Sequence, residues 1–89
     1  AEYGMLLALA SVDTERGVIA GDCEVIARGF NLTDDIENEI RSVVRDTVNG
    51  AVFDEESLNE LTRTVKKAVR KLFYRDRQFP VIIPIIVQD

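Results

Sequence analysis

Short apolar runs separated by polar breaks occupy the first third of the chain. Residues 5–12 (Met-Leu-Leu-Ala-Leu-Ala-Ser-Val) form an apolar run with the length of a buried strand. The polar segment 13–17 ends in a glycine, which supplies the positive φ of a hairpin turn. An extended pattern resumes over 18–28, where Gly21 and Asp22 indicate a bulge or a second turn. This part of the chain is therefore predicted to form a β-hairpin with an irregular return strand.

The next segment has the spacing of an amphipathic helix. Thr33 or Asp34 is expected to cap it, and Glu37 stands three residues after Asp34, the spacing that satisfies free amides at a helix start. Asn49 and Gly50 provide the stop signal. The apolar stripe between them consists of Ile36, Ile40, Val43, Val44 and Val48.

A second helix is predicted to start at Asp54, or at Ser57 with Glu60 as its capping partner. Because only a short link separates the two helices, they should lie antiparallel. The apolar stripe of the second helix consists of Leu58, Leu61, Val65, Ala68, Val69 and Leu72. Phe73 and Tyr74 are expected to cover the edge of the core, with an interface as the alternative place for Tyr74.

The segment 81–87 (Val-Ile-Ile-Pro-Ile-Ile-Val) is the most strand-like part of the chain. Phe79-Pro80 breaks the preceding helix, and Pro84 cannot donate to a sheet ladder, so the strand is predicted to be an edge strand or locally bulged. The predicted fold is α+β, with the order β-β-α-α-β. In it, a three-stranded β-sheet packs on two antiparallel α-helices.

The first and last strands are apolar on both faces. Leu7 and Leu9 lie opposite Leu6 and Ala8, and the odd-numbered residues of 81–87 lie opposite its even-numbered isoleucines. Two helices cover only one face of such a sheet. The other face, or its edge, is expected to contact another domain or subunit, with a crossing loop as the alternative cover. The predicted assembly surface consists of Leu7, Leu9, Ile82 and Ile86.

Histidine is absent from the chain, which excludes a Ser-His-Asp triad, a Cys-His pair and a His-rich metal site. The carboxylates at 34–39 and 54–56 have no calcium-loop spacing and suit the first turns of helices. Cys23 stands between Asp22 and Glu24, whose charges disfavour a thiolate. A single cysteine cannot form an internal disulfide, which is typical of a reducing compartment. No apolar run is long enough to span a membrane.

Charge is unevenly divided along the chain. Residues 1–60 carry 4 basic and 14 acidic side chains, whereas residues 61–89 carry 7 basic and 2 acidic ones, so the two parts have net charges of −10 and +5. The side of the second helix opposite its apolar stripe carries Arg63, Lys66, Lys67, Arg70 and Lys71. This basic face can contact RNA phosphates or an acidic partner, or it can simply be a solvated helix face. No interleaved aromatic set accompanies it in the sequence.

Arg28, Gly29 and Phe30 form a strand end followed by a glycine turn. The arginine can anchor a carboxylate or phosphate, but a pairing with Asp34 or Asp35 that fixes the strand–helix junction is the favoured interpretation.

Together, these segments resemble a known family. Residues 24–30 (Glu-Val-Ile-Ala-Arg-Gly-Phe), 72–74 (Leu-Phe-Tyr) and 80–86 (Pro-Val-Ile-Ile-Pro-Ile-Ile), separated by a helical pair, resemble the C-terminal domain of ribonuclease J over essentially 5–87. The departures are a cysteine at 23, where the family often has proline, an alanine at 27 in place of serine, and a phenylalanine at 79 in place of a basic residue.

The resemblance implies a parent enzyme of the bacterial cytoplasm that degrades and matures RNA by 5′-3′ exonucleolytic and endonucleolytic cleavage. Its metallo-β-lactamase and β-CASP domains, with zinc, would lie outside this chain. Residues 1–89 would be a single accessory domain without catalytic, cofactor or metal residues. The resemblance also implies assembly, either by self-association or with the parent's catalytic domains, and access to RNA through the parent. An RNA phosphate-contacting module that uses the basic helix face is the alternative. A KH-like regulator lacks support because no Gly-x-x-Gly loop joins the helices.

Overall fold

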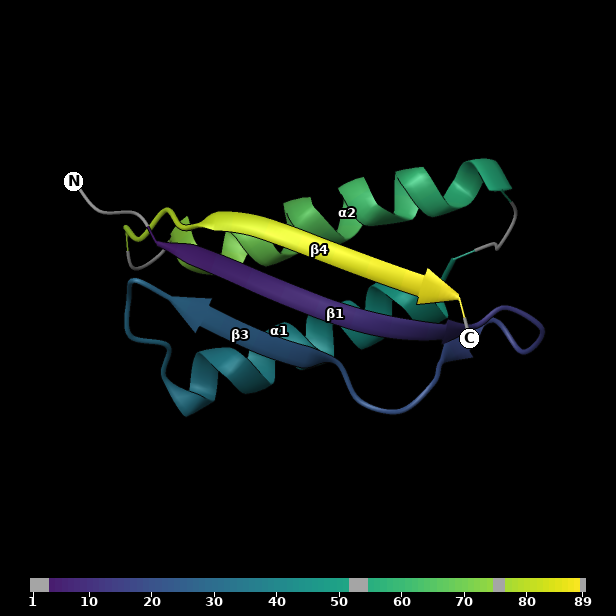
Figure 1. Cartoon of the computed structure of the whole chain (residues 1–89), viewed down its shortest axis with the longest axis horizontal. Helices are drawn as coiled ribbons and strands as arrows, with labels where there is room; N and C mark the ends of the chain where they lie inside the picture. The colour runs from purple at the N-terminus through teal and green to yellow at the C-terminus, as the bar shows by residue number, and fades with distance from the viewer. Residues whose placement is uncertain (1–3, 52–54, 75–76, 89) are drawn as a thin grey trace.

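A sheet and a pair of helices form two layers in the computed structural model (Figure 1), which describes residues 4–51, 55–74 and 77–88, without the side chains of 55 and 56. The elements in chain order are β1 (Met5–Asp13), β2 (Val18–Ile19), β3 (Glu24–Arg28), α1 (Asp34–Asn49), α2 (Glu55–Tyr74) and β4 (Val81–Gln88). Both helices lie behind the sheet in Figure 1 and run antiparallel to each other, as predicted.

The sheet is mixed, with β1 in its centre. β4 pairs with β1 in parallel along nearly its whole length, while β3 and the short β2 pair with it antiparallel on the other side. The predicted three-stranded sheet is therefore wrong in strand number, because the return strand of the hairpin is divided. Val12 pairs with Ile19 but Leu9 pairs with Glu24, so a step of three residues along β1 corresponds to five along the return strand. The additional residues form the break at Gly21, whose φ is 77°.

Helix α1 begins as the sequence predicts. Thr33 is the cap, and its Oγ1 accepts a hydrogen bond from the Ile36 N–H at 3.3 Å. The helix ends at Gly50, which has a φ of −94° and is therefore not left-handed; the Ala51 N–H donates to the carbonyl of Val48 at 3.1 Å. Three residues of the predicted stripe are fully buried: Ile40, Val44 and Val48.

Helix α2 begins at Glu55, so the alternative start at Ser57 is too late, and Asp54 lies outside the described residues. The predicted stripe faces the sheet. Its buried members are Leu61, Val65 and Val69, joined by Phe73, which belongs to the core itself and not only to its edge.

Burial alternates residue by residue along β1, and its even-numbered residues face the helices. The parallel register pairs Leu6 with Ile82, so Ile82 is only 3% exposed and Ile86 packs against the same core. Placing Ile82 and Ile86 on the predicted assembly surface is therefore wrong. Alternation along a strand separates its odd-numbered from its even-numbered side chains. When both groups are apolar, only the pairing register shows which group of one strand lies on the same face as which group of its neighbour.

Pro84 lies on an edge strand, as predicted, because β4 pairs only with β1 among the described residues. The Val81 N–H donates to the carbonyl of Gly4 at 3.0 Å, and in a parallel ladder alternate residues bond to the same neighbour. The nitrogen of Pro84 therefore points to the open edge, where its missing hydrogen interrupts no bond of the sheet.

Two glycines bring the strand ends together. Gly4 and Gly29 have φ values of 68° and 84°, and a Cβ on Gly4 would lie 2.7 Å from both the Arg28 carbonyl oxygen and Cδ1 of Phe30. Phe30 in turn packs edge-on against Phe73, with ring centroids 5.8 Å apart. Gly29 and Phe30 thus fix the junction between β3 and α1.

We expect Gly4→Ala to destabilise the chain more than Gly21→Ala. Both residues are left-handed, which costs an alanine about 1–2 kcal/mol, but no atom lies within 4 Å of a Cβ built on Gly21. The clash at Gly4 adds about 1–3 kcal/mol. Urea unfolding of the two variants measures the difference, and equal losses would contradict the close approach described above.

Candidate interaction surfaces

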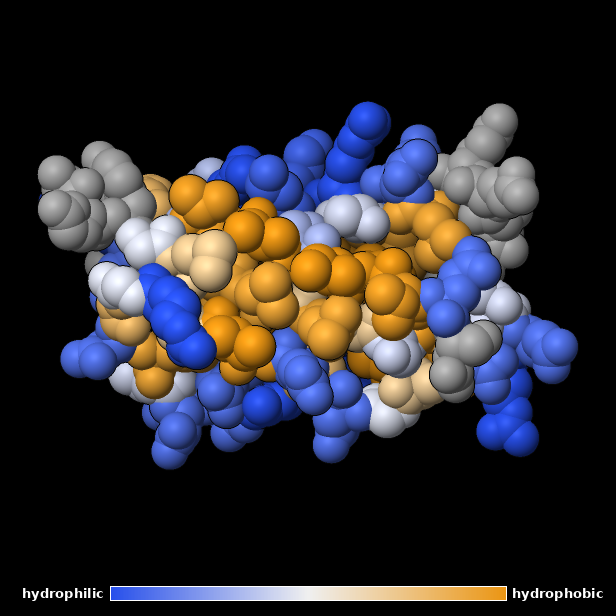
Figure 2. Space-filling model, in the orientation of Figure 1, coloured by the Kyte–Doolittle hydropathy of each residue, from blue (hydrophilic) through white to orange (hydrophobic). Residues whose placement is uncertain are grey.

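The face of the sheet that points away from the helices is apolar and uncovered. Figure 2 shows a continuous hydrophobic band across it, and no described loop crosses it in Figure 1. Its exposed members include Val81 (58%) and Ile85 (38%). We call this surface the open face, and its apolar residues are Met5, Leu7, Leu9, Ile26, Val81, Ile83, Ile85 and Val87. Leu7 and Leu9 of the predicted assembly surface lie on it. Contiguous apolar patches of this kind mark interaction sites.

Charged residues border the open face on β3. Glu24 pairs with Leu9 and Arg28 pairs with Met5, so both side chains emerge on the open face, on either side of Ile26. Arg28 donates from Nη1 to the carbonyl of Ala27 at 3.0 Å, and no ion pair within the described residues joins it to the acidic start of α1. The predicted pairing of Arg28 with Asp34 or Asp35 is wrong because the arginine belongs to the opposite face of the sheet from α1.

The basic face of α2 is divided between two hollows. Lys66 and Arg70 line a groove of ≈ 390 Å³ between the end of α2 and the start of β4, which we call the α2–β4 groove. Arg63 and Lys67 lie on a shallower hollow of ≈ 290 Å³, and Lys71 is exposed beside neither. The other residues that line the α2–β4 groove are Phe73, Tyr74, Gln78, Phe79, Pro80, Val81 and Ile82.

Two exposed aromatic rings stand at this groove. Tyr74 and Phe79 are 53% and 51% exposed, and their ring centroids are 5.9 Å apart at an interplanar angle of 50°. The Arg77 N–H donates to the carbonyl of Tyr74 at 3.3 Å, which holds the segment before β4 against the end of α2. No aromatic set beside the basic face was predicted from the sequence. The signal that was available is the i, i+4, i+8 spacing of Lys66, Arg70 and Tyr74, which places all three on one side of the helix.

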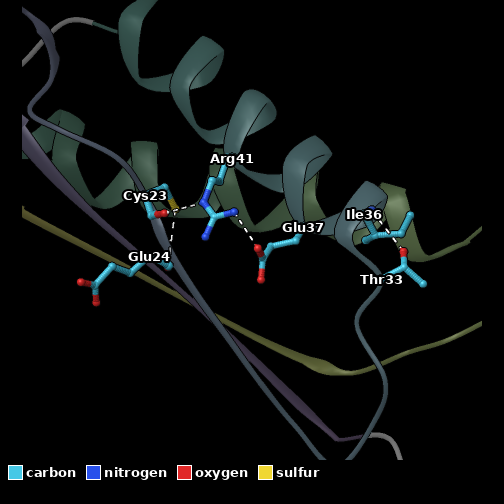
Figure 3. Close-up of polar contacts among 6 residues, drawn as sticks. All are labelled: Cys23, Glu24, Thr33, Ile36, Glu37 and Arg41. Carbon is cyan, nitrogen blue, oxygen red and sulfur yellow. Dashed lines mark hydrogen bonds and ion pairs between the residues drawn. The ribbon is translucent and has the colours of Figure 1, made fainter.

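Arginines of α1 hold the loop before β3, a role that was not predicted from the sequence. Arg41 donates from Nε to the carbonyl of Cys23 at 3.0 Å and from Nη1 to Oε2 of Glu37 at 2.7 Å (Figure 3). Nη2 of Arg45 lies 3.1 Å from Oδ1 of Asp22. These bonds attach the loop between β2 and β3 to helix α1.

Cys23 itself is buried in the core. Burial raises the pKa of its thiol, Asp22 and Glu24 raise that pKa further, and Arg41 opposes them. A protonated, buried thiol is unreactive, which agrees with the expectation that Asp22 and Glu24 disfavour a thiolate here.

We expect stability to fall above about pH 8.5 through Cys23. Because the pKa of this thiol is higher in the folded chain, the unfolded chain loses the proton first, and rising pH then favours unfolding by at most about 1.4 kcal/mol per pH unit. Urea unfolding between pH 7.5 and 9.5 should show this decline, and Cys23→Ala should flatten it. Parallel pH curves for the two proteins would contradict the prediction.

Within residues 4–51, 55–74 and 77–88, no group of three or more histidine, cysteine, aspartate or glutamate residues is placed to hold a metal ion. Asp34, Asp35 and Glu37 occupy the first turn of α1, where the helix dipole favours them. Neither α1 nor α2, as far as they are described, is long and apolar enough to cross a membrane.

The chain was compared with known protein families and with curated proteins. The family model described as the ribonuclease J C-terminal domain matches residues 1–89, the whole chain. No curated protein matches significantly.

Proposed function

The chain belongs to the ribonuclease J C-terminal domain family, and we propose from this that it is the assembly domain of a ribonuclease J-like enzyme. The parent would degrade and mature RNA in the bacterial cytoplasm by 5′-3′ exonucleolytic and endonucleolytic cleavage. Catalysis and zinc would reside in the metallo-β-lactamase and β-CASP domains outside this chain. The observation that carries the proposal is the open face, an uncovered apolar surface on a sheet whose other face is already filled by α1 and α2.

A second copy of this chain is the partner that fits the open face best. Glu24 and Arg28 flank Ile26 on the same strand. A two-fold axis that crosses the strands near Ile26 would place each Arg28 opposite Glu24 of the other copy. Two sheets packed face to face lie about 10 Å apart, a gap that these two side chains can bridge together. The face is thus complementary to itself in charge as well as in hydrophobicity.

The edge of β4 is a poorer site for association than the open face. A strand added to that edge would need outward-pointing N–H groups, and Pro84 lacks one in the middle of the row. Face-to-face packing needs no donor from β4. It also buries the exposed valine and isoleucine side chains, each of which contributes roughly 1.5–3 kcal/mol when fully buried.

We expect the 89-residue chain to self-associate in sedimentation velocity, with a mass that rises with concentration and persists in high salt. Ile85→Lys places a charge in the middle of the open face and should shift the chain to monomer, because its burial would then require an unpaired ammonium. Ser42→Lys adds the same charge on an exposed position of α1 and should leave association unchanged. A strictly monomeric chain, or equal association of all three proteins, would overturn the proposal.

The two-fold arrangement makes a separate prediction for the charges. Glu24→Arg alone or Arg28→Glu alone would oppose like charges in both symmetric pairs and weaken the dimer by roughly tenfold, whereas the double variant should restore affinity. Dissociation constants from sedimentation equilibrium measure the effect. If the double variant loses as much dimerisation free energy as the two single variants lose together, the partner is not oriented in this way.

A further inference from the structure

We propose that the α2–β4 groove binds a segment of single-stranded nucleic acid. Lys66 and Arg70 would contact its phosphates, and Tyr74 and Phe79 would stack on an unpaired base. The groove differs from the open face in chemistry and does not depend on it: the open face is an apolar surface, whereas the groove combines cations with aromatic rings over an apolar floor.

The two cations are placed to act together. Lys66 and Arg70 are one helical turn apart, which puts their head groups on the same side of α2. None of the ion pairs found among the described residues involves either of them, so no described carboxylate neutralises their charge. In contrast, Arg41 and Arg45 of α1 are bound to Glu37 and Asp22.

The aromatic rings supply what a cationic helix face lacks. Tyr74 and Phe79 are each about half exposed, and their rings form a tilted pair at a groove that is also lined by the buried Phe73, Pro80 and Ile82. Its volume of ≈ 390 Å³ lies within the range of roughly 300–1,000 Å³ that is usual for ligand sites. Positive groups beside exposed aromatic rings are the typical combination for unpaired nucleotides, because every base has a face that stacks.

A single strand fits these residues better than the other anionic partners do. A duplex offers phosphates but keeps its base faces stacked inside, so Tyr74 and Phe79 would have no role. An acidic peptide would neutralise Lys66 and Arg70, but its carboxylates have no ring face that could stack on Tyr74 and Phe79. The test therefore has to separate the contribution of the rings from that of the charges.

The experiment measures fluorescence anisotropy of labelled oligouridylate, of about ten nucleotides, with the 89-residue chain at several salt concentrations. We expect Lys66→Gln/Arg70→Gln to lower affinity at least tenfold, and to reduce the slope of log affinity against log salt by about 1.4, which corresponds to two phosphate contacts on a single strand. The matched control is Arg63→Gln/Lys67→Gln, which makes the same charge change on the same helix outside the groove and should weaken binding by less than about threefold.

The rings are tested separately. Tyr74→Ala should lower affinity about tenfold, Tyr74→Phe should retain it, and neither change should affect binding of an abasic oligomer of the same length. Circular dichroism verifies that each variant is folded, and Ile85→Lys, which alters only the open face, should still bind the oligonucleotide. This last result keeps the groove separate from the proposed assembly.

Three results would overturn the inference. Equal losses for the two charge variants would mean that the whole basic face attracts polyanions without using the groove. Undiminished binding by Tyr74→Ala would mean that no base stacks at the groove. Competition by decaglutamate that equals competition by oligouridylate would indicate an acidic protein partner instead of a nucleic acid.

Discussion

The parallel pairing of β1 with β4 is the constraint on which the rest of the structure depends. β3 lies on one side of β1 and β4 on the other, so the chain has to cross over β1 between them. Helices α1 and α2 make up that crossing and consequently lie on the same face of the sheet (Figure 1). One connection covers one face only. The open face is therefore a result of the topology, and it remains apolar because β1 and β4 are apolar on both sides.

Much of the fold could be predicted from the sequence because local rules agree with one another there. The capping Thr33, the helical stripes and the edge position of Pro84 each follow from the chemistry of a few neighbouring residues. The division of the return strand into β2 and β3 could not be predicted in detail. A bulge and a break differ only in the number of unpaired residues between two paired positions of the strand. The glycine at 21 indicates an irregularity and does not specify its size.

The interaction surfaces were less predictable because they depend on pairings between distant residues. Register decided that Ile83, and not Ile82, shares the open face with Leu7. Phe79 lies beside Tyr74 in the fold, and nothing in the spacing of the two residues along the sequence predicts this contact. The residue types alone indicate an apolar sheet face and a basic helix face. Which residues belong to each surface follows only from the pairing of the strands.

The division of charge in the sequence corresponds to two different uses of arginine and lysine. In the first half of the chain, Arg41 and Arg45 bind carboxylates and a backbone carbonyl, so their charges are used in holding the loop before β3. On α2 the basic residues have no ion pair among the described residues, and two of them border an aromatic groove. Cations without internal partners contribute little to folding.

Strand β4 is the element that the core alone does not explain. Burial against the helices accounts for Ile82 and Ile86, but the outward-facing residues of an edge strand in a solvated sheet are ordinarily polar. Here Val81, Ile83 and Ile85 point outward instead. Leaving such a row in water gives no benefit to the isolated fold and exposes it to aggregation. The assembly proposed for this chain would account for β4 as a whole, because its even-numbered isoleucines already pack in the core and its odd-numbered residues would be covered by the partner.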